Sequence, residues 1–329
     1  MLERSSEQTI LDSTTGLPLA GIVSVQDGQY HGCAAVSDGS AQCWQVDSGN
    51  GNTSGQLGNG TTMANAVLYR ATPVLMAANT PLTDVSSVAH GVSNAGCAVT
   101  TAGGLYCWGD LTWLVNKGTA LLSGYAQAIT TDGATPLANV QQVALGYTNA
   151  CALLKGDSAH EVWCWGNNAA GELGQGDAMP RQYPIKVLGL TDPTKLVIEP
   201  TVDFGQRATV CALDGGSVRC WGDNYGGAAG VNSATNPIPG PTLVVNQSGA
   251  ALDNVQDMEL GNSVFAVLRG DALWDWGYGD TGYAANYGIP NVVAIGYAGG
   301  NGGGGPRYVT SDGIYHSAMT NVTVNCGAL

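Results

Sequence analysis

Charge is scarce in this chain, and positive charge is scarcer still. Charged residues make up 11% of the sequence, against about 25% in an average soluble protein. The 11 Lys and Arg are outnumbered by 25 Asp and Glu, which gives a formal net charge of −14. Since nucleic-acid binding depends on clustered positive charge, we expect no nucleic-acid partner. A run of about 18 apolar residues is also missing, so we expect no membrane-spanning segment.

Residues suited to catalysis are few. The four histidines are His31, His90, His160 and His316, and none belongs to a Ser/His/Asp or Cys/His arrangement that the sequence supports. The glycine-rich stretch 299–305 lacks the Lys of a phosphate-binding loop and is interpreted as a connector. Turns that contain Asp lack the Asp-x-Asp-x-Asp-Gly spacing of calcium loops. We therefore predict a protein that is not an enzyme, with no cofactor and no metal site.

What the sequence does contain is a repeat. Four times a Cys is followed about ten residues later by a second Cys that leads into Trp. The pairs are Cys33 and Cys43, Cys97 and Cys107, Cys151 and Cys164, and Cys211 and Cys220. A fifth copy keeps Trp276 and Gly277, and we align Phe265 and Asp275 with the two cysteines. Internal repeats of this kind indicate a repeat architecture.

Each unit has the pattern of β-strands. Valine and leucine alternate with small polar residues, strand-length runs end at Gly, Asn, Asp or Pro, and no window holds a sustained helical period. A short apolar alternation precedes each Cys pair and recurs six times, for example at 19–25, 82–88 and 137–143. This predicts an all-β fold, a β-propeller of four-stranded antiparallel blades. We expect a single domain over residues 1–329 with six blades, or alternatively seven.

At these positions the chain resembles the regulator-of-chromosome-condensation repeat family. Residues 28–33 fit the opening of the family unit, Gly-x-x-His-x-Cys, and residues 55–60 and 171–176 fit its closing Gly-Gln-Leu-Gly-x-Gly. The resemblance covers residues 17–316 and implies an interaction scaffold, usually with seven blades. The best-known member is a nuclear exchange factor for a small GTPase. The acidic composition of this chain does not support that activity, and a shared fold alone does not give function.

Cysteine use points to an oxidising compartment. Eight of the nine cysteines form short-range pairs, and turn residues such as Ser37-Asp38-Gly39 lie between the two members of a pair. A hairpin would place these cysteines opposite each other, so the repeat register selects disulfides within each unit; the alternative is a column of small buried core residues. Zinc is disfavoured, because there is no Cys-x-x-Cys and the histidines do not cluster near the pairs. We predict an extracellular or cell-surface location, with no signal peptide in this chain.

Four residues outside the repeat columns are candidate interface residues. Cys326 is the odd cysteine and is either half of an intermolecular bridge or a buried thiol in the last blade. Trp113, Trp163 and Trp274 are either exposed, for stacking on sugars or anchoring a partner, or partly buried under a blade loop.

The two terminal segments are candidates for closing the propeller. The last unit is short by one strand. Either the N-terminal extension 1–16, through residues 9–11, or the C-terminal strand or tail 317–329, through residues 322–324, is expected to supply it. Such a strand would cover an edge that otherwise pairs with another chain.

Two classes of function fit these observations. The first is a non-enzymatic extracellular scaffold that binds protein, including copies of itself, as a subunit of a surface assembly or filament. The second is a lectin-like glycan-binding module, and an inhibitor of a secreted enzyme is a further alternative. Low charge and Cys326 favour self-association, whereas no set of aromatic and Asp or Asn residues repeats in one loop of several units, as glycan binding would require. We therefore expect a self-associating protein.

Overall fold

The computed structural model describes residues 8–27, 31–46, 52–63, 68–90, 94–113, 121–201, 207–260, 264–277, 282–286, 288–296, 307–312, 314–317 and 320–325. The chain divides into two compact units, residues 1–150 with 182–184 and residues 151–181 with 185–329. Within the described ranges the regular structure consists of β-strands and one short 3-10 turn, η1 (Tyr225–Gly227). No helix in these ranges is long and apolar enough to cross a membrane.

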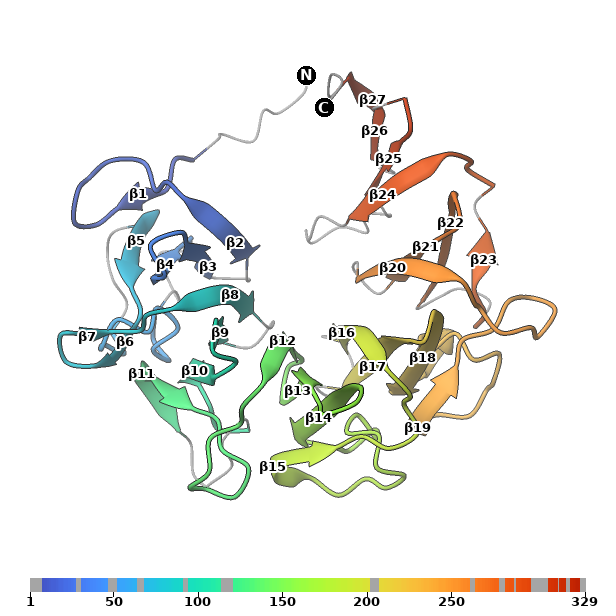
Figure 1. Ribbon diagram of the computed structural model, residues 1–329, viewed down its shortest axis with the longest axis horizontal. Coiled ribbons are helices and arrows are strands. Elements are labelled where there is room, and N and C mark those ends of the chain that lie inside the picture. Colours follow the sequence, from blue (N-terminus) through green and yellow to red (C-terminus); the bar gives the residue numbers. More distant parts are fainter. Residues whose placement is uncertain are drawn as a thin grey trace. The chain divides into compact units, whose positions relative to one another are not determined.

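The first unit holds two complete sheets and a two-stranded ribbon (Figure 1). The first sheet has the order β1-β5-β4-β3-β2, the second has the order β11-β10-β9-β8, and the ribbon pairs β6 with β7. The strands are β1 (Leu11–Asp12), β2 (Ile22–Asp27), β3 (His31–Val36), β4 (Ala41–Gln45), β5 (Arg70–Pro73), β6 (Leu75–Ala77), β7 (Thr80–Pro81), β8 (Val85–His90), β9 (Ala95–Thr100), β10 (Leu105–Asp110) and β11 (Leu122–Ala128). Each repeat therefore forms one sheet of strands that are consecutive in the chain.

The third sheet, β12-β13-β14-β15, has residues in both units, and the second unit holds three more sheets. Their orders are β16-β17-β18-β19, β20-β21-β22-β23 and β24-β25-β26-β27. The strands are β12 (Val140–Leu145), β13 (Asn149–Lys155), β14 (His160–Gly166), β15 (Arg181–Lys186), β16 (Pro193–Thr201), β17 (Arg207–Asp214), β18 (Ser217–Gly222), β19 (Ile238–Leu243), β20 (Val255–Leu260), β21 (Val264–Arg269), β22 (Ala272–Gly277), β23 (Ala285–Asn286), β24 (Val292–Gly296), β25 (Arg307–Thr310), β26 (Ile314–Ser317) and β27 (Thr320–Asn325). The described residues thus form six blade-like sheets, one for each of the six repeats counted in the sequence.

In each sheet one strand pairs with the first strand of the cysteine-type hairpin and precedes it in the chain (β2, β8, β12, β16, β20 and β24), and the residue before this strand has a special conformation. In five of the six sheets its φ is positive, between 55° and 70°, and these residues are Gly21, Asp84, Asn139, Asn254 and Asn291. Glycine, Asn and Asp adopt this left-handed conformation at the least cost. This backbone requirement explains why Gly, Asn or Asp recurs within the apolar alternation of five repeats, directly before the strand begins.

In the first compact unit, the turn between the two cysteines of a hairpin is hydrogen-bonded to the next sheet. The N–H of Val85 donates to the carbonyl oxygen of Gly39, and the N–H of Val140 donates to that of Gly103, both at 2.9 Å. A Cβ at Gly103 would lie 2.9 Å from the Cα of Asn139. Residue 103 must therefore be glycine, because only a residue without a Cβ lets the two backbones come this close.

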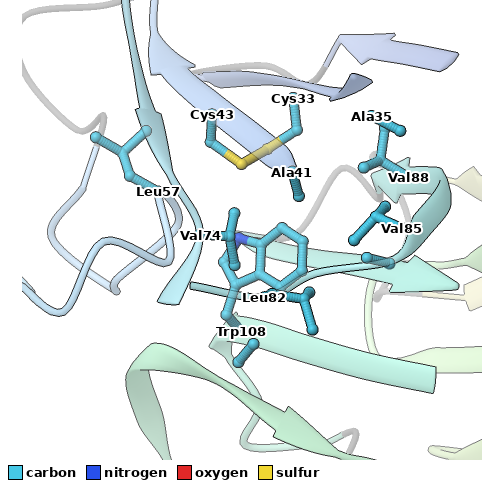
Figure 2. Packing of buried hydrophobic residues seen from close by; sticks show 12 residues of the cluster. Cys33, Ala35, Ala41, Cys43, Leu57, Val74, Leu82, Val85, Val88 and Trp108 are labelled. Atoms are coloured by element: carbon cyan, nitrogen blue, oxygen red, sulfur yellow. A yellow bond between two sulfur atoms is a disulfide. The ribbon is translucent and has the colours of Figure 1, made fainter. Parts of the chain in front are cut away.

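The five repeat tryptophans lie in the core, as the repeat pattern predicted. At most 5% of the surface of each is exposed, and they are Trp44, Trp108, Trp165, Trp221 and Trp276. Figure 2 shows Trp108 packed among Leu57, Val74 and Leu82. Burial of a large apolar side chain contributes about 1.5–3 kcal/mol, so this column is a main source of stability.

The loop that follows the Trp strand is organised by an asparagine. The side-chain oxygen of Asn52 accepts a hydrogen bond from the N–H of Leu57 at 3.0 Å, and that of Asn168 accepts one from Leu173 at 2.9 Å. Asn224 repeats this contact five residues before Ala229, at 2.9 Å. The loop at 225–230 keeps little of the closing Gly-Gln-Leu-Gly-x-Gly motif in sequence. It nevertheless keeps the hydrogen bond to the asparagine side chain.

The terminal strands join different sheets. β1 pairs in parallel with β5 in the first sheet, where Leu11 lies opposite Arg70. Ile10 packs against the buried cluster of Ala34, Trp44 and Ala71. Residues 8–16, the described part of the N-terminal segment, therefore do not supply a strand of the last sheet; β27, from the C-terminal segment, is the fourth strand there.

Candidate functional site

The paired cysteines form four disulfides, each within one hairpin. They join Cys33 to Cys43, Cys97 to Cys107, Cys151 to Cys164, and Cys211 to Cys220. All eight residues are fully buried. The register places each pair directly opposite in neighbouring antiparallel strands, for example Cys33 opposite Cys43. These are the pairs that the repeat register selects.

The alignment of the fifth copy is wrong by one residue. In the structure Ala266, and not Phe265, lies opposite Asp275 and so occupies the cysteine column. Phe265 lies opposite Trp276, and the two rings stack with centroids 5.5 Å apart. The corresponding position in the first sheet is Gly32, whose Cβ would lie 2.7 Å from the Trp44 ring. A stacked aromatic pair replaces that close approach in the fifth sheet.

An apolar surface lies on β2, the strand that pairs with the cysteine hairpin of the first sheet. Ile22 and Val25 are 46% and 53% exposed. The repeat register aligns them with Val85 and Val88 of β8, which are 3% and 5% exposed. The counterparts in β12 and β20 are also buried, and they are Val140, Val143, Val255 and Met258. Exposure at β2 therefore departs from the pattern of the other repeats, and we call Ile22 and Val25 the β2 face.

The packing of β8 shows what such a face normally contacts. Val85 and Val88 pack in one cluster with Ala35, Ala41 and the Cys33–Cys43 disulfide of the first sheet (Figure 2). Strand β8 of the second sheet thus packs on the small residues and the disulfide of the first sheet.

The candidate tryptophans have different surroundings. Trp113 follows β10 and is 44% exposed. Trp163 is half-buried, and its indole N–H donates to Glu161 at 2.9 Å. Trp274 is half-buried beneath the guanidinium of Arg269, which lies 5.2 Å from the ring centroid. Trp163 and Trp274 are thus held by neighbouring charged groups, and Trp113 is the most exposed of the three candidates.

The charged partner of Trp163 is itself fixed. Glu161 also pairs with Lys186 at 2.7 Å. The hydrogen bonds from Lys186 and Trp163 hold the pKa of the Glu161 carboxyl below its usual value. The fourth interface candidate, Cys326, lies outside the described residues.

A pair of histidines whose ring nitrogens are buried was missed by the sequence argument. His31, at the start of β3, and His90, at the end of β8, meet edge to face with ring centroids 3.9 Å apart. One ring nitrogen of each histidine and the Cys33 sulfur lie within 4.8 Å of one another. The expectation that histidines lie away from the cysteine pairs is therefore wrong here. His31 stands two residues before Cys33, but only the packing of β8 brings His90 to the same place.

Both imidazoles are neutral at physiological pH. His31 is 1% exposed, and burial, followed by the neighbouring His90, holds its pKa well below the usual value. Burial lowers the pKa of His90 to about 4, with a small opposing effect from the backbone of Ala95. No ring nitrogen of the pair has a hydrogen-bond partner of good geometry among the residues that the structure describes. Buried polar atoms without partners are uncommon and call for an explanation.

Comparison with known proteins assigns the repeat. The family model of the regulator of chromosome condensation (RCC1) repeat matches residues 140–172. This stretch holds β12, β13, β14 and the Asn168 loop, which together are most of one repeat. Residues 140–172 are thus similar to one RCC1-type repeat.

Curated relatives share part of the chain. Protein RCC2 of Homo sapiens is 28% identical over 85 residues, which cover 26% of this chain and 16% of that protein. Serine/threonine-protein kinase Nek9 of Xenopus laevis is 30% identical over 129 residues, which cover 37% of this chain and 13% of that protein. The chain therefore matches about one sixth or less of the length of these relatives.

Solved structures show the fold. Human WBSCR16 superposes with a TM-score of 0.67 at 16% identity, over 90% of this chain and 75% of that one. Yeast RCC1 (Prp20), solved bound to Kap60, superposes with a TM-score of 0.64 at 19% identity, over 89% of this chain and 68% of that one. The predicted all-β propeller of four-stranded blades is confirmed, with a blade number consistent with six or seven.

Proposed function

We propose that this RCC1-type propeller is a non-enzymatic extracellular protein that binds other proteins, and that copies of it associate through the β2 face. The observation that carries the proposal is the exposure of Ile22 and Val25, because the equivalent residues of other repeats are buried. Exposed apolar residues at positions that are otherwise core mark a surface for contact with another protein.

The disulfides and the fold support the compartment and the kind of partner. Four disulfides in one chain fit a secreted or surface-exposed protein, since cytosolic thiols are kept reduced. Yeast RCC1, which has a similar fold, was solved in complex with another protein. His160 pairs with Asp192, and His31 and His90 pack on each other beside the sulfur of the Cys33–Cys43 disulfide, so these three histidines form no Ser/His/Asp or Cys/His catalytic arrangement.

A second copy of the chain fits the β2 face by composition. Each copy carries the same exposed apolar pair, Ile22 and Val25, so the β2 faces of two copies can cover each other. The low charge content adds little desolvation cost to such a contact. Glycan binding has weaker support, because two of the three candidate tryptophans, Trp163 and Trp274, are held by Glu161 and Arg269.

The proposal is tested by two matched substitutions in β2. Val25→Gln places an amide on the β2 face, whereas Val23→Gln changes the neighbouring bulge residue, which is 59% exposed. The bulge position is polar and exposed in other sheets, as at Ser86 and Gln141. Sedimentation velocity over a range of concentrations should show assemblies for the wild type and for Val23→Gln, and monomers for Val25→Gln. A wild type that stays monomeric throughout, or a Val25→Gln variant that assembles like the wild type, contradicts self-association through this face.

A further inference from the structure

The cluster of His31, His90 and Cys33 has the composition of a metal site. Two neutral imidazoles and a cysteine sulfur lie within 4.8 Å of one another. Zinc in proteins is bound by His nitrogens at about 2.0–2.1 Å and by Cys thiolate at about 2.3 Å, usually in a tetrahedron. Small movements of side chains would bring these three groups to such distances. The one obstacle is that Cys33 is bonded to Cys43, since a disulfide sulfur is not a thiolate ligand.

We propose that the chain binds zinc at His31, His90 and Cys33 when the Cys33–Cys43 disulfide is reduced. A dithiol reductant gives two electrons and two protons to the disulfide, becomes a disulfide itself, and leaves Cys33 and Cys43 as thiols. Zn²⁺ then displaces the Cys33 thiol proton to solvent and takes a lone pair from each imidazole. A second disulfide can reverse the reduction: it takes two electrons from Cys33 and Cys43 and two protons, one from the Cys43 thiol and one from solvent, and becomes two thiols. The Cys33–Cys43 disulfide that forms holds no thiolate, and the ion is released.

Burial prepares the histidines for this role. His31 is 1% exposed, and its two ring nitrogens have no hydrogen-bond partner in the described part of the chain. Metal ligands must be deprotonated, and burial already keeps both imidazoles neutral by lowering the pKa of each. Zinc therefore does not compete with protons for these nitrogens at neutral pH. The unpartnered nitrogens, which are unfavourable in the disulfide form, gain a partner in the zinc form.

The other hairpins provide an internal comparison. In the second hairpin, Ala95 stands two residues before Cys97, as His31 stands before Cys33. Leu145 ends β12 at the position that His90 has in β8. The Cys97–Cys107 pair has the same burial and the same separation of 10 residues as Cys33–Cys43. The two sites thus differ in their histidines and are otherwise closely matched.

The experiment frees one thiol at a time without any reductant. Cys43→Ala leaves Cys33 as a thiol beside the histidines, and Cys107→Ala leaves Cys97 as a thiol without them. Both variants are made with Cys326→Ser, so that no other unpaired cysteine is present. The probes are Co²⁺, whose absorption reports thiolate ligation, and Zn²⁺, whose stoichiometry is measured after dialysis. The fifth hairpin, with Ala266 opposite Asp275, shows that a sheet of this fold forms without the cross-link.

The outcomes separate a built site from adventitious binding. We expect Cys43→Ala to bind about one Zn²⁺ with a Co²⁺–thiolate absorption band, and Cys107→Ala to show neither. Adding His90→Gln to Cys43→Ala should weaken zinc binding by about 100-fold. Loss of a residue that only supports a metal ligand already lowers affinity by about 10- to 100-fold, and His90 is proposed as a ligand itself. Zn²⁺ should also raise the melting temperature of Cys43→Ala and not that of Cys107→Ala, because the ion binds the folded state. Equal binding by the two single-thiol variants, binding unaffected by His90→Gln, or no binding by a folded Cys43→Ala overturns the proposal.

Discussion

The indole N–H of Trp108 donates a hydrogen bond of 2.9 Å to the backbone carbonyl oxygen of Gln56, which lies 52 residues earlier in the chain. Trp221 makes the same contact with Glu172 at 2.8 Å. The Gly-Gln-Leu-Gly loop of one repeat therefore receives the tryptophan of a later repeat. The closing motif and the Cys-Trp motif, which are separate in sequence, form one structural contact.

Gly58 should be irreplaceable in this contact. Its φ is +62°, and a Cβ would lie 3.0 Å from the Trp108 ring and 2.9 Å from Val74. We expect Gly58→Ala to lower the free energy of unfolding by about 2–5 kcal/mol, from backbone strain and overpacking together. Gly176→Ala is the control, since Gly176 has φ +80° with no atom within 4 Å of the added Cβ; it should cost about 1–2 kcal/mol. Urea unfolding measures both, and equal costs would show that contact with Trp108 does not matter.

Glu172 should destabilise the protein at neutral pH. It occupies the position of Gln56, is 1% exposed, and accepts a hydrogen bond from the N–H of Ala170 at 2.8 Å. Burial is the largest cause that raises the pKa of its carboxyl, and the charge of Asp223 adds to it. The protonated form therefore stabilises the fold fully below the unfolded pKa of 4.5, and this contribution is lost as the pH rises through the folded pKa.

The matching substitution is Glu172→Gln, which restores the residue of the first loop. It should raise the free energy of unfolding at pH 7 by about 0.5–2 kcal/mol, and the gain should shrink toward zero as the pH falls to about 4, where Glu172 is protonated in the unfolded chain as well. Gln56→Glu, the reverse exchange, should cost stability with the same pH dependence. Melting temperatures at several pH values between 4 and 7.5 measure both, and a gain from Glu172→Gln that does not vary with pH would refute the role of the buried charge.

A fifth disulfide should form at Ala266 and Asp275. These residues lie opposite each other in the column that holds Cys211 and Cys220 in the fourth sheet. Ala266→Cys with Asp275→Cys should therefore cross-link and add about 2–3 kcal/mol of stability. Phe265→Cys with Asp275→Cys, the pair implied by the sequence alignment, should remain as two thiols and lose the ring stacking on Trp276. Thiol titration and peptide mapping without reduction distinguish the two registers, and would also reveal any bridge between different repeats.

Residue patterns could predict the sheets but not the relations between them. The Cys and Trp columns identify the repeats, because each column has a fixed place in one hairpin. The separation of the cysteines varies between 9 and 13 residues, so the fifth hairpin, with no cysteine to mark it, could be aligned one residue out. The apolar-Ala-apolar stretch at Phe265 matched Cys-Ala-Leu equally well in sequence.

The candidate sites depend on contacts that no single repeat contains. Ile22 and Val25 are β-branched apolar residues, as Val85 and Val88 are, and they follow the same spacing, so their exposure could not be foreseen from the pattern. The meeting of His31 with His90 requires β8 to pack on the first sheet, and nothing in either local sequence specifies it. Cys326 and Trp113 could be chosen from sequence because they fall outside the columns, but this does not show what they contact.

Association through the β2 face should strengthen as salt is added. Each copy carries a formal net charge of −14, so two copies repel each other at low ionic strength. The face itself consists of Ile22 and Val25, which make no ion pairs that salt could weaken. Raising the ionic strength from about 0.01 M to 0.15 M shortens the Debye length from about 30 Å to 8 Å and removes most of the repulsion. We therefore expect the association constant to rise with salt, as measured by light scattering on the wild type and on Cys326→Ser.

An interface built from salt bridges would show the opposite dependence. A protein that remains monomeric at every salt concentration, with Cys326 open to alkylation in the folded state, would exclude self-assembly and leave a foreign protein or a glycan as the partner.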